Sequence, residues 1–317
     1  MVKEYDLIII GSGPAGLTAG IYAARYNLNF LIIGKLNGGA ISEAHKVCNY
    51  PSQNNITGFQ LTQGMINHVK ELGGEIKQGE IIEIKKEKNK FIIITNKEKY
   101  FAKKIILATG REKQELGVKG EKEFLGKGVS YCATCDAAFY KNKIVAVAGG
   151  GNAAITASLL LSEYAKKIYV IYRKDKFFRA EPAWVNQLEK EKKIEPIFNS
   201  NIKKIYGKNS VEGIELDNKK KLDVNGVFIE IGFKPNEKLP NQLGIETEKG
   251  YIITDKTQKT NIEGVYAAGD STKNQLKQVI TAAAEGAIAS TSIYEELKLG
   301  EAKWVYLEKN VSIVERE

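Results

Sequence analysis

Two cysteines three positions apart, Cys132 and Cys135, are the residues of this chain best suited to redox chemistry. A helix that begins at this segment, YCATCD, lets the two sulfurs close a small disulfide ring. The helix dipole then lowers the pKa of the thiols and so favours thiol–disulfide exchange. Asp136 follows at once and can donate or accept a proton. The segment therefore predicts a reactive centre made of Cys132, Cys135 and Asp136.

A zinc site is the alternative use of this pair. His45 and Cys48 have the same spacing, so the two pairs together form a ligand set that zinc accepts. Three cysteines are too few for a disulfide framework, which leaves redox or metal chemistry for the pair. We favour redox chemistry and expect no metal, because nucleotide-binding motifs flank the pair and give zinc no purpose. Cys48 by itself is expected to be a small buried residue.

The first of these motifs is GSGPAG (11–16), which follows the strand-like run YDLIII (5–10) and precedes a helix-like run of small residues. This is the context that the Gly-x-Gly-x-x-Gly dinucleotide motif requires. Gly11 permits the tight turn, Gly13 lets the backbone approach a pyrophosphate, and Gly16 lets helix and strand pack closely. The helix N-terminus then presents free N–H groups to the phosphates. We expect a dinucleotide here.

One feature of such sites is missing from the first motif. An acidic residue about 20 positions further on usually binds the ribose. Here the second strand ends Ile33-Gly34-Lys35, without a carboxylate. The ribose contact is therefore expected from the backbone or from Lys35.

The second motif, GGGNAA (149–154), fits Gly-x-Gly-x-x-Ala, and its context favours binding of a phosphorylated nicotinamide nucleotide. The strand after it has no acid at its end, which argues against NAD. Arg173, Lys174 and Arg179 follow that strand and can bind a 2′-phosphate through charge-assisted hydrogen bonds. The expected contacts within the motif and this basic segment are Gly149, Gly151, Asn152, Ala153, Arg173, Lys174 and Arg179.

The elements that carry these motifs occur in two copies. Strand, glycine turn, helix and strand at 5–33 are repeated at 143–171, and short β-like segments follow each copy. We therefore predict an α/β fold of two Rossmann-like, three-layer ββα domains, the second inserted into the first. The outer domain is expected at 1–111 and 242–317, and the inserted domain at 112–241. The later segments expected are strands at 80–84, 91–95, 99–101, 104–110, 201–206, 211–216, 221–224, 227–233, 251–254 and 264–270, and a helix at 280–297.

Composition narrows the class of protein. The 317 residues contain 43% hydrophobic and 27% charged side chains, which is ordinary for a globular chain with a buried core. No apolar run is long enough for a membrane helix, and no signal-peptide pattern is present, so we expect a cytoplasmic protein. The net charge is +9, but Lys and Glu are interleaved and form no basic patch with stacking aromatics, which argues against nucleic acid. The positive net charge of the chain favours binding to an acidic protein partner.

These motifs together resemble the low-molecular-weight thioredoxin reductase family. The resemblance runs from about residue 4 to 297. It rests on CATCD between two glycine motifs, supported by GGAISEAHKVCNYP (38–51), ATGR (108–111), GFKPN (232–236) and GVYAAGD (264–270).

The resemblance implies FAD in the outer domain and NADPH in the inserted one. The FAD contacts that it implies are Gly11, Ser12, Gly13, Pro14, Ala15, Gly39, Asn49, Thr109, Gly110, Gly269 and Asp270. It also places Lys277, Gln278 and Val279, at the start of the last helix, beside the flavin ring.

The resemblance also implies the reaction. NADPH passes a hydride to the flavin, and the reduced flavin opens the Cys132–Cys135 disulfide. Cys135 is then the sulfur that faces the flavin, Cys132 attacks the disulfide of thioredoxin or a similar small protein, and Asp136 is the acid and base. A homodimer, and an inserted domain that swings on short connections near 112 and 241, are implied as well.

Two departures from the family pattern bear on these expectations. The family usually has His-Arg-Arg after the second strand, separated by three residues from a further Arg; here four residues separate Tyr172-Arg173-Lys174 from Arg179. The electron donor is therefore either NADPH or another donor such as ferredoxin. Residues 298–317, with Trp304, extend past the usual end of the family, and we expect either an edge strand or a dimer contact there.

Overall fold

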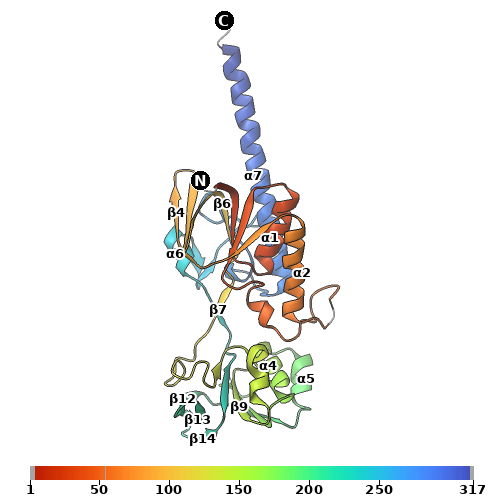
Figure 1. Cartoon of the computed structure of the whole chain (residues 1–317), viewed down its shortest axis with the longest axis vertical. Coiled ribbons are helices and arrows are strands. Elements are labelled where there is room, and N and C mark those ends of the chain that lie inside the picture. Colours follow the sequence, from red (N-terminus) through yellow and green to blue (C-terminus); the bar gives the residue numbers. More distant parts are fainter. Residues whose placement is uncertain (1–3, 54, 315–317) are drawn as a thin grey trace. The chain divides into compact units, whose positions relative to one another are not determined.

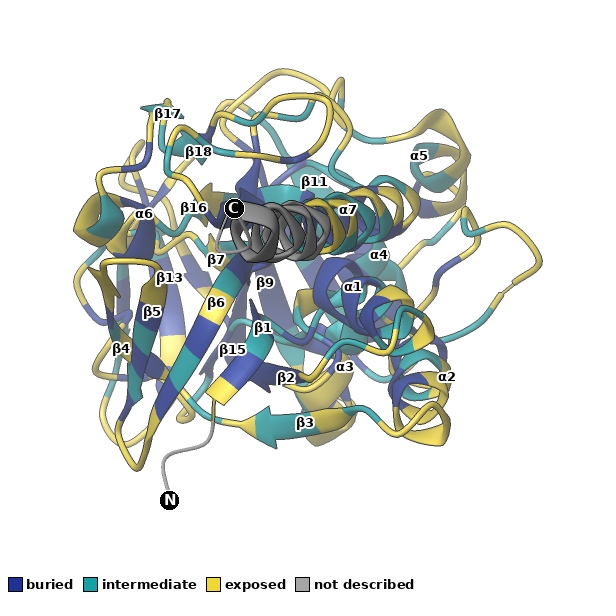
Figure 2. Ribbon diagram, turned by 90° about the horizontal axis from the view of Figure 1, so that it is seen from above, coloured by how far each residue is buried: buried dark blue, intermediate teal, exposed yellow. Residues whose placement is uncertain are grey.

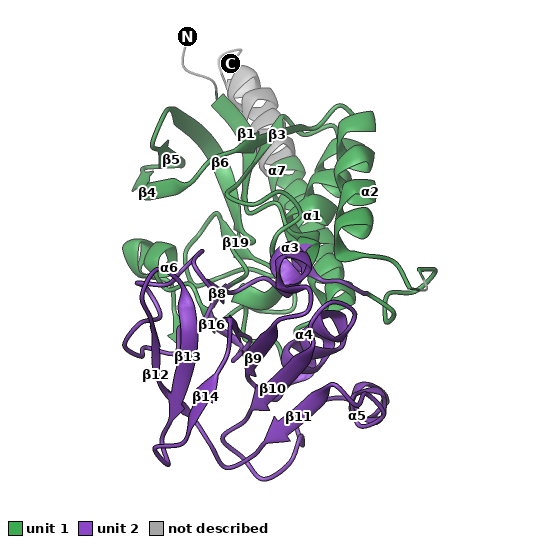
Figure 3. Cartoon of the chain, turned by 60° about the horizontal axis from the view of Figure 1, so that its bottom comes forward, with its two compact units in different colours: residues 1–42, 47–111, 235–317 green, residues 43–46, 112–234 purple. Residues whose placement is uncertain are grey.

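The computed structural model describes residues 4–53 and 55–314, which divide into two compact units (Figures 1 and 3). Unit 1 comprises Met1–Ser42, Val47–Arg111 and Pro235–Glu317, and unit 2 comprises Glu43–Lys46 and Glu112–Lys234. The chain crosses between them in β7 (Arg111–Lys113) and β16 (Phe233–Pro235), which pair as a two-stranded sheet. Unit 2 thus ends at Lys234, earlier than the boundary that we expected at 241.

The sheet of unit 1 has the strand order β3-β2-β1-β6-β5-β4, and β19 pairs with β6. β1, β2, β3, β6 and β19 run parallel, while β4, β5 and β6 form an antiparallel meander. The bounds are β1 Glu4–Ile10, β2 Phe30–Gly34, β3 Glu75–Gln78, β4 Ile81–Glu87, β5 Lys90–Thr95, β6 Lys99–Leu107 and β19 Val265–Ala267.

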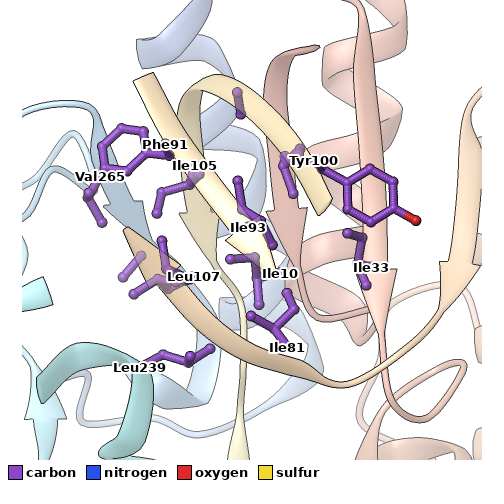
Figure 4. Close-up of a cluster of buried hydrophobic side chains, with 14 of the residues drawn as sticks. Ile10, Ile33, Ile81, Phe91, Ile93, Tyr100, Ile105, Leu107, Leu239 and Val265 are labelled. Atoms are coloured by element: carbon purple, nitrogen blue, oxygen red, sulfur yellow. The ribbon is translucent and has the colours of Figure 1, made fainter. Parts of the chain in front are cut away.

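Alternating side chains of β1 divide the core of unit 1 into two layers. Leu7 and Ile9 pack with the helices. Ile8 and Ile10 point into a second cluster, which Phe91, Leu107 and other residues of the sheet close (Figure 4). This two-residue period is what a strand between two covering layers requires. The helices of unit 1 are α1 Pro14–Arg25, α2 Gly58–Glu71, α6 Lys238–Leu243 and α7 Val279–Val314, with a 3-10 turn at η3 Gly269–Ser271. A further 3-10 turn, η1 Ala40–Glu43, begins in unit 1, and its last residue, Glu43, belongs to unit 2.

Unit 2 repeats the plan. Its parallel sheet has the order β11-β10-β9-β15-β8, and an antiparallel sheet β12-β13-β14 forms its second β layer. On β9, Val145 and Val147 pack with the helices, while Ala146 and Ala148 pack with the antiparallel strands. The bounds are β8 Val129–Ser130, β9 Ile144–Ala148, β10 Lys167–Ile171, β11 Ile194–Ile197, β12 Ile202–Gly207, β13 Val211–Leu216, β14 Lys221–Asp223, β15 Gly226–Ile229, α3 Ala133–Asp136, α4 Asn152–Ser162, α5 Pro182–Leu188 and η2 Ala137–Tyr140.

The predicted α/β fold with two three-layer Rossmann-like units is confirmed, and the errors are local. The two strands expected at 99–101 and 104–110 are one strand, β6. The strand expected at 227–233 is broken into β15 and β16, because Gly232 has φ +106° and cannot continue an extended strand. A short hairpin, β17 (Thr247–Glu248) with β18 (Tyr251–Ile252), stands where one strand was expected at 251–254.

The last helix is longer than the sequence predicts. α7 continues to Val314, so the edge strand expected within 298–317 is wrong, and the side chain of Trp304 lies outside the described residues. Figure 2 shows that most residues of the strands β1, β2 and β9 are buried. In the described ranges we find no helix that is both long and apolar enough to cross a membrane.

Candidate redox centre and nucleotide sites

Cys132 and Cys135 form a disulfide at the start of a short helix in unit 2. Cys132 is the N-cap of α3, and its sulfur accepts a hydrogen bond from the Cys135 N–H at 3.2 Å. Asp136 closes this single turn. The predicted pair and its helix start are thus present, with Cys135 exposed and Cys132 half-buried.

Buried polar contacts hold the backbone on the N-terminal side of the disulfide. The Ser130 hydroxyl accepts from the Cys132 N–H at 3.0 Å. The Tyr131 hydroxyl donates to Glu121 at 2.6 Å. Glu121 is only 2% exposed and accepts three backbone N–H groups as well, so it is a fixed anchor. Burial, and then the bond to Glu121, raise the pKa of Tyr131, which stays a donor across the neutral range.

Charged side chains gather around a hollow of about 520 Å³ beside Cys132. Lys113 donates both to the Glu43 carboxylate and to the Tyr131 carbonyl, the group just before Cys132. The sequence gives no sign of this cluster, because Glu43 is far from the cysteines along the chain. The hollow is lined by Glu43, Lys113, Glu115, Leu125, Gly126, Val129, Ser130, Tyr131, Cys132 and Asp136.

Glu230, at the end of β15, is a second residue that the sequence did not single out. Burial raises the pKa of its carboxyl to about 7, against the opposing effect of Lys113 and with a small contribution from Glu43. Its backbone carbonyl lies against Gly149, where a side-chain Cβ would come within 2.1 Å of it. Glu230 therefore changes charge near neutral pH at the edge of the sheet that carries the second glycine turn.

The third cysteine does not behave as expected. Cys48 is exposed, so the prediction of a buried residue is wrong. Its neighbour Val47 points inwards and pairs with Ile56 in an isolated bridge, and the alternation of extended backbone turns Cys48 outwards. Over the described ranges, no three His, Cys, Asp or Glu side chains gather in the way that a metal site requires.

The first glycine turn has the geometry of a pyrophosphate site. A Cβ at Gly11 would come within 2.0 Å of the Ala108 carbonyl, and one at Gly16 within 1.9 Å of the Gly11 carbonyl, so packing alone requires these two glycines. At Gly13 the nearest protein atom to such a Cβ is 3.8 Å away. Protein packing leaves that position open, as close approach of a ligand requires.

Predicted contacts from distant parts of the chain meet around this turn. A Cβ on Gly39 would lie 2.9 Å from the Gly13 Cα, and Asn49 donates to the Gln278 side chain at 3.0 Å. Ser12 is buried, and Pro14 and Ala15 open α1. Lys35 pairs with Glu80 at 3.4 Å on the exposed surface.

The parallel strands of unit 1 bring further predicted residues to the same edge of the sheet. β6 ends just before Thr109 and Gly110, and β19 ends just before Gly269 and Asp270. The Thr109 hydroxyl is buried and has no hydrogen-bond partner within the described part of the chain. A buried hydroxyl of this kind is expected to bond to a ligand or to water. The donor set and the open turn therefore fit a bound dinucleotide.

A buried carboxylate on α7 fixes the loop that carries Gly269 and Asp270. Glu285 accepts from the Gly269 N–H at 2.7 Å, from the Thr272 hydroxyl at 3.0 Å and from the Asn274 amide. No signal in the sequence points to Glu285, which stands six residues, nearly two turns, after Val279, the first residue of α7.

Lys277 precedes this helix and is also held in place. Its ammonium lies 4.4 Å from the centre of the Tyr251 ring and donates to the Thr272 carbonyl. Burial lowers the pKa of Lys277, and Arg111 adds to that effect against Asp270 and Glu285. The predicted flavin-side segment, Lys277 to Val279, is thus an ordered helix start with a partly buried cation.

The second glycine turn repeats the features of the first. A Cβ at Gly149 would clash with the Glu230 carbonyl, whereas at Gly151 no protein atom lies within 4 Å. Asn152 exchanges two hydrogen bonds with Glu181, at 2.8 and 2.7 Å, and Ala153 follows in the first turn of α4. The turn therefore offers the same open position to a second nucleotide.

The predicted basic residues follow β10 and are all exposed. Arg179 forms an isolated parallel bridge with Gly151, so the longer spacing still brings it back to the glycine turn. Arg173 and Lys174 follow the end of β10. Among the described residues, Arg173, Lys174 and Arg179 form no ion pair.

The chain is similar over most of its length to proteins of known function. The family model described as "Pyridine nucleotide-disulphide oxidoreductase" matches residues 5–286. The chain is 38% identical to a thioredoxin reductase of Bacillus subtilis over 298 residues, which cover 92% of this chain and 94% of that protein. It superposes on the crystal structure of thioredoxin reductase from Lactococcus lactis with a TM-score of 0.88 and 34% identity, covering 92% and 98% of the two chains. A ferredoxin-flavin thioredoxin reductase from Clostridium acetobutylicum gives a TM-score of 0.53 at 32% identity, covering 94% and 100%.

Proposed function

The chain belongs to the pyridine nucleotide-disulphide oxidoreductase family, and on that basis we propose that it is an FAD-dependent thioredoxin-disulfide reductase that takes its electrons from NADPH. The observation that carries the proposal is the Cys132–Cys135 disulfide at a helix start, in a chain with two open glycine turns. Such an enzyme reduces a disulfide of thioredoxin or a similar small redox protein.

FAD is assigned to unit 1, the outer domain. Gly13 leaves room for the pyrophosphate, the Thr109 hydroxyl is free to bond to it or to the sugar chain, and Asp270 stands at the end of β19. When bound, FAD accepts a hydride from NADPH and supplies two electrons to the disulfide. The remaining contacts proposed are Gly11, Ser12, Pro14, Ala15, Gly16, Lys35, Gly39, Asn49, Gly110, Gly269, Lys277, Gln278 and Val279.

NADPH is assigned to unit 2, the inserted domain. Gly151 leaves the diphosphate room, and α4 begins there with free N–H groups. Arg179 returns to this turn, and Arg173 and Lys174 are exposed cations that suit a 2′-phosphate. The remaining contacts proposed are Gly149, Asn152 and Ala153.

The residues of the chain perform the exchange itself. In the reduced dithiol, Cys132 loses a proton and its thiolate attacks one sulfur of the partner's disulfide, which forms a mixed disulfide and releases the other sulfur as a thiolate. Cys135 then attacks Cys132, which restores the internal disulfide and releases the second sulfur. Asp136, at the end of the same helical turn, is proposed to carry the protons. Two electrons leave the dithiol, and the partner gains them as two thiols.

We propose a cytoplasmic location and a homodimer for this enzyme, both by analogy with its relatives. Thioredoxin is the proposed partner, and neither nucleic acid nor a membrane has a role in the reaction.

Anaerobic titration of the purified protein with NADPH and NADH, followed through the visible flavin band, tests the proposal. Bleaching by NADPH at concentrations where NADH has no effect would support both nucleotide sites, and transfer to thioredoxin would then complete the activity. A flavin that dithionite reduces but neither nucleotide bleaches would contradict the assignment of NADPH, and reduced ferredoxin would be the next donor tested.

A further inference from the structure

The wall of the hollow beside Cys132 carries more acid than base. Its charged members are the carboxyl groups of Glu43, Glu115 and Asp136 and the ammonium of Lys113. The whole chain has a net charge of +9, so this local excess of negative charge opposes the charge of the protein as a whole.

The charges do not cancel within the hollow. Lys113 is engaged by Glu43 and by the Tyr131 carbonyl, which leaves Glu115 and Asp136 unmatched by any cation of the lining. Glu115 pairs with Lys122 at 3.2 Å, but the two side chains are 53% and 81% exposed, so water screens this pair. The ion pairs of the described residues do not include Asp136.

We propose that this hollow receives a cationic side chain next to the disulfide of the protein substrate, so that the enzyme selects disulfides flanked by Lys or Arg. The proposal rests on the proposed function, because it takes Cys132 as the attacking sulfur. It also reverses the expectation of an acidic partner, since the charge beside the reacting sulfur acts at shorter range than the net charge of the chain.

The cation acts in the first step of the exchange. When the Cys132 thiolate attacks the substrate disulfide, a flanking ammonium or guanidinium would lie in the negative field of Glu115 and Asp136. Opposite charges hold the encounter complex together and raise the rate of association, and salt weakens both effects. A substrate with a carboxylate at the same place would be repelled.

Two small disulfides of similar size and opposite charge test this selection. Cystamine carries two ammonium groups, and 3,3′-dithiodipropionate carries two carboxylates. The complete FAD-loaded enzyme is reduced with dithionite, freed from excess reductant and mixed with each disulfide, and the thiols released are measured over time. Each rate is divided by the rate of dithiothreitol with the same disulfide, which removes the difference in intrinsic reactivity.

We expect the corrected rates to favour cystamine by about tenfold in dilute buffer, and the ratio to fall towards one in about 1 M salt, where the screening length is about 3 Å. Glu115→Gln should reduce the ratio about threefold, and Glu115→Lys should bring it near or below one. Glu123→Gln is the matched control, because Glu123 is exposed on the same segment but does not line the hollow. Since each ratio comes from one preparation, partial loss of folded enzyme does not change it.

Two results would overturn this inference and leave the proposed reductase activity intact. The first is a corrected rate ratio near one in the unaltered enzyme, and the second is a ratio that neither Glu115 variant changes. A reduced enzyme that releases no thiol from either disulfide or from thioredoxin would contradict the proposed function, and this inference with it.

Discussion

Arg111 donates two hydrogen bonds, from Nε and Nη2, to one carboxylate oxygen of Asp270, at 2.9 and 2.6 Å. The two residues are 159 positions apart: Arg111 is the first residue of β7, and Asp270 lies in the 3-10 turn η3. Both side chains are largely shielded, so this pair is stronger than a surface ion pair. The pair therefore holds the Asp270 carboxylate in one orientation at the proposed FAD site.

Replacement of Arg111 with Met should weaken the binding of FAD by about tenfold, because Asp270 loses the partner that orients it. The measurement is titration of the apoprotein with FAD, followed by quenching of flavin fluorescence. Lys90→Met is the control, since Lys90 forms an ion pair of similar length with Glu4 but on the exposed surface. An Arg111 variant that binds FAD as tightly as the control would show that Asp270 does not depend on this pair.

Glu285→Ala should destabilise unit 1 by about 3 kcal/mol, because the Gly269 N–H and the Thr272 hydroxyl would be left buried without an acceptor. Urea unfolding of the apoprotein measures this loss, and Glu285→Gln, which keeps one acceptor, should recover part of it. Glu295→Ala on the same helix is exposed and should change stability by less than about 0.5 kcal/mol. Equal losses in the two alanine variants would contradict the role of Glu285.

Glu230 should make unit 2 less stable as the pH rises. Because burial raises the pKa of its carboxyl to about 7, the folded state holds a proton that the unfolded state releases near pH 4.5. Stability is therefore lost as the pH rises from about 4.5, and the loss is complete above about 7. Glu230→Gln should match the unaltered protein at pH 4.5 and exceed it at pH 8 by up to about 3 kcal/mol. Urea unfolding at the two pH values measures the difference, and a constant difference would argue against it.

The roles of the two cysteines predict different trapped products. Cys135→Ser leaves Cys132 to attack thioredoxin but removes the group that resolves the mixed disulfide, so a covalent complex should accumulate. Cys132→Ser should form little of it. Intact-protein mass spectrometry after mixing with oxidised thioredoxin distinguishes the two. Trapping by the Cys132 variant alone would reverse the assignment, and neither variant should keep more than about 0.1% of the turnover.

Arg179→Met should weaken the binding of NADPH by about tenfold or more and leave that of NADH nearly unchanged, because only NADPH has the 2′-phosphate. Stopped-flow reduction of the flavin at varied nucleotide concentrations gives both affinities. Lys176→Met is the matched control, since Lys176 is an exposed cation of the same loop. Equal effects of Arg179→Met on both nucleotides would place Arg179 at the diphosphate instead.

Short sequence motifs predicted those strands and helices that are formed by residues close together in the sequence. The glycine turn with its flanking strand and helix predicted β1, α1 and β2, and the same pattern predicted β9, α4 and β10, because each is fixed by neighbours in sequence. The helix α2 was missed, although Thr57 and Gln60 form a capping box at its start that the sequence displays.

The sequence alone did not predict contacts between residues that lie far apart along the chain. The spacing of Cys132 and Cys135 predicted the disulfide, but the position of Glu43 beside Lys113 depends on how the chain returns in space. The same holds for Glu285 and for the pairing of Arg111 with Asp270, whose partners lie 16 and 159 positions away. Cys48 was misjudged because residue type alone does not say which side of an extended segment faces the core.

The pairing of β7 with β16 brings the two ends of unit 2 next to each other, about one strand spacing apart. A segment whose ends adjoin can be cut out and closed with a few residues, or exchanged for another, without a long new connection. Residues 112–234 should therefore be expressible as a separate protein, and residues 1–111 joined to 235–317 by a short turn should form another. The same feature would let a gene acquire or replace its nucleotide-and-disulfide module in one insertion.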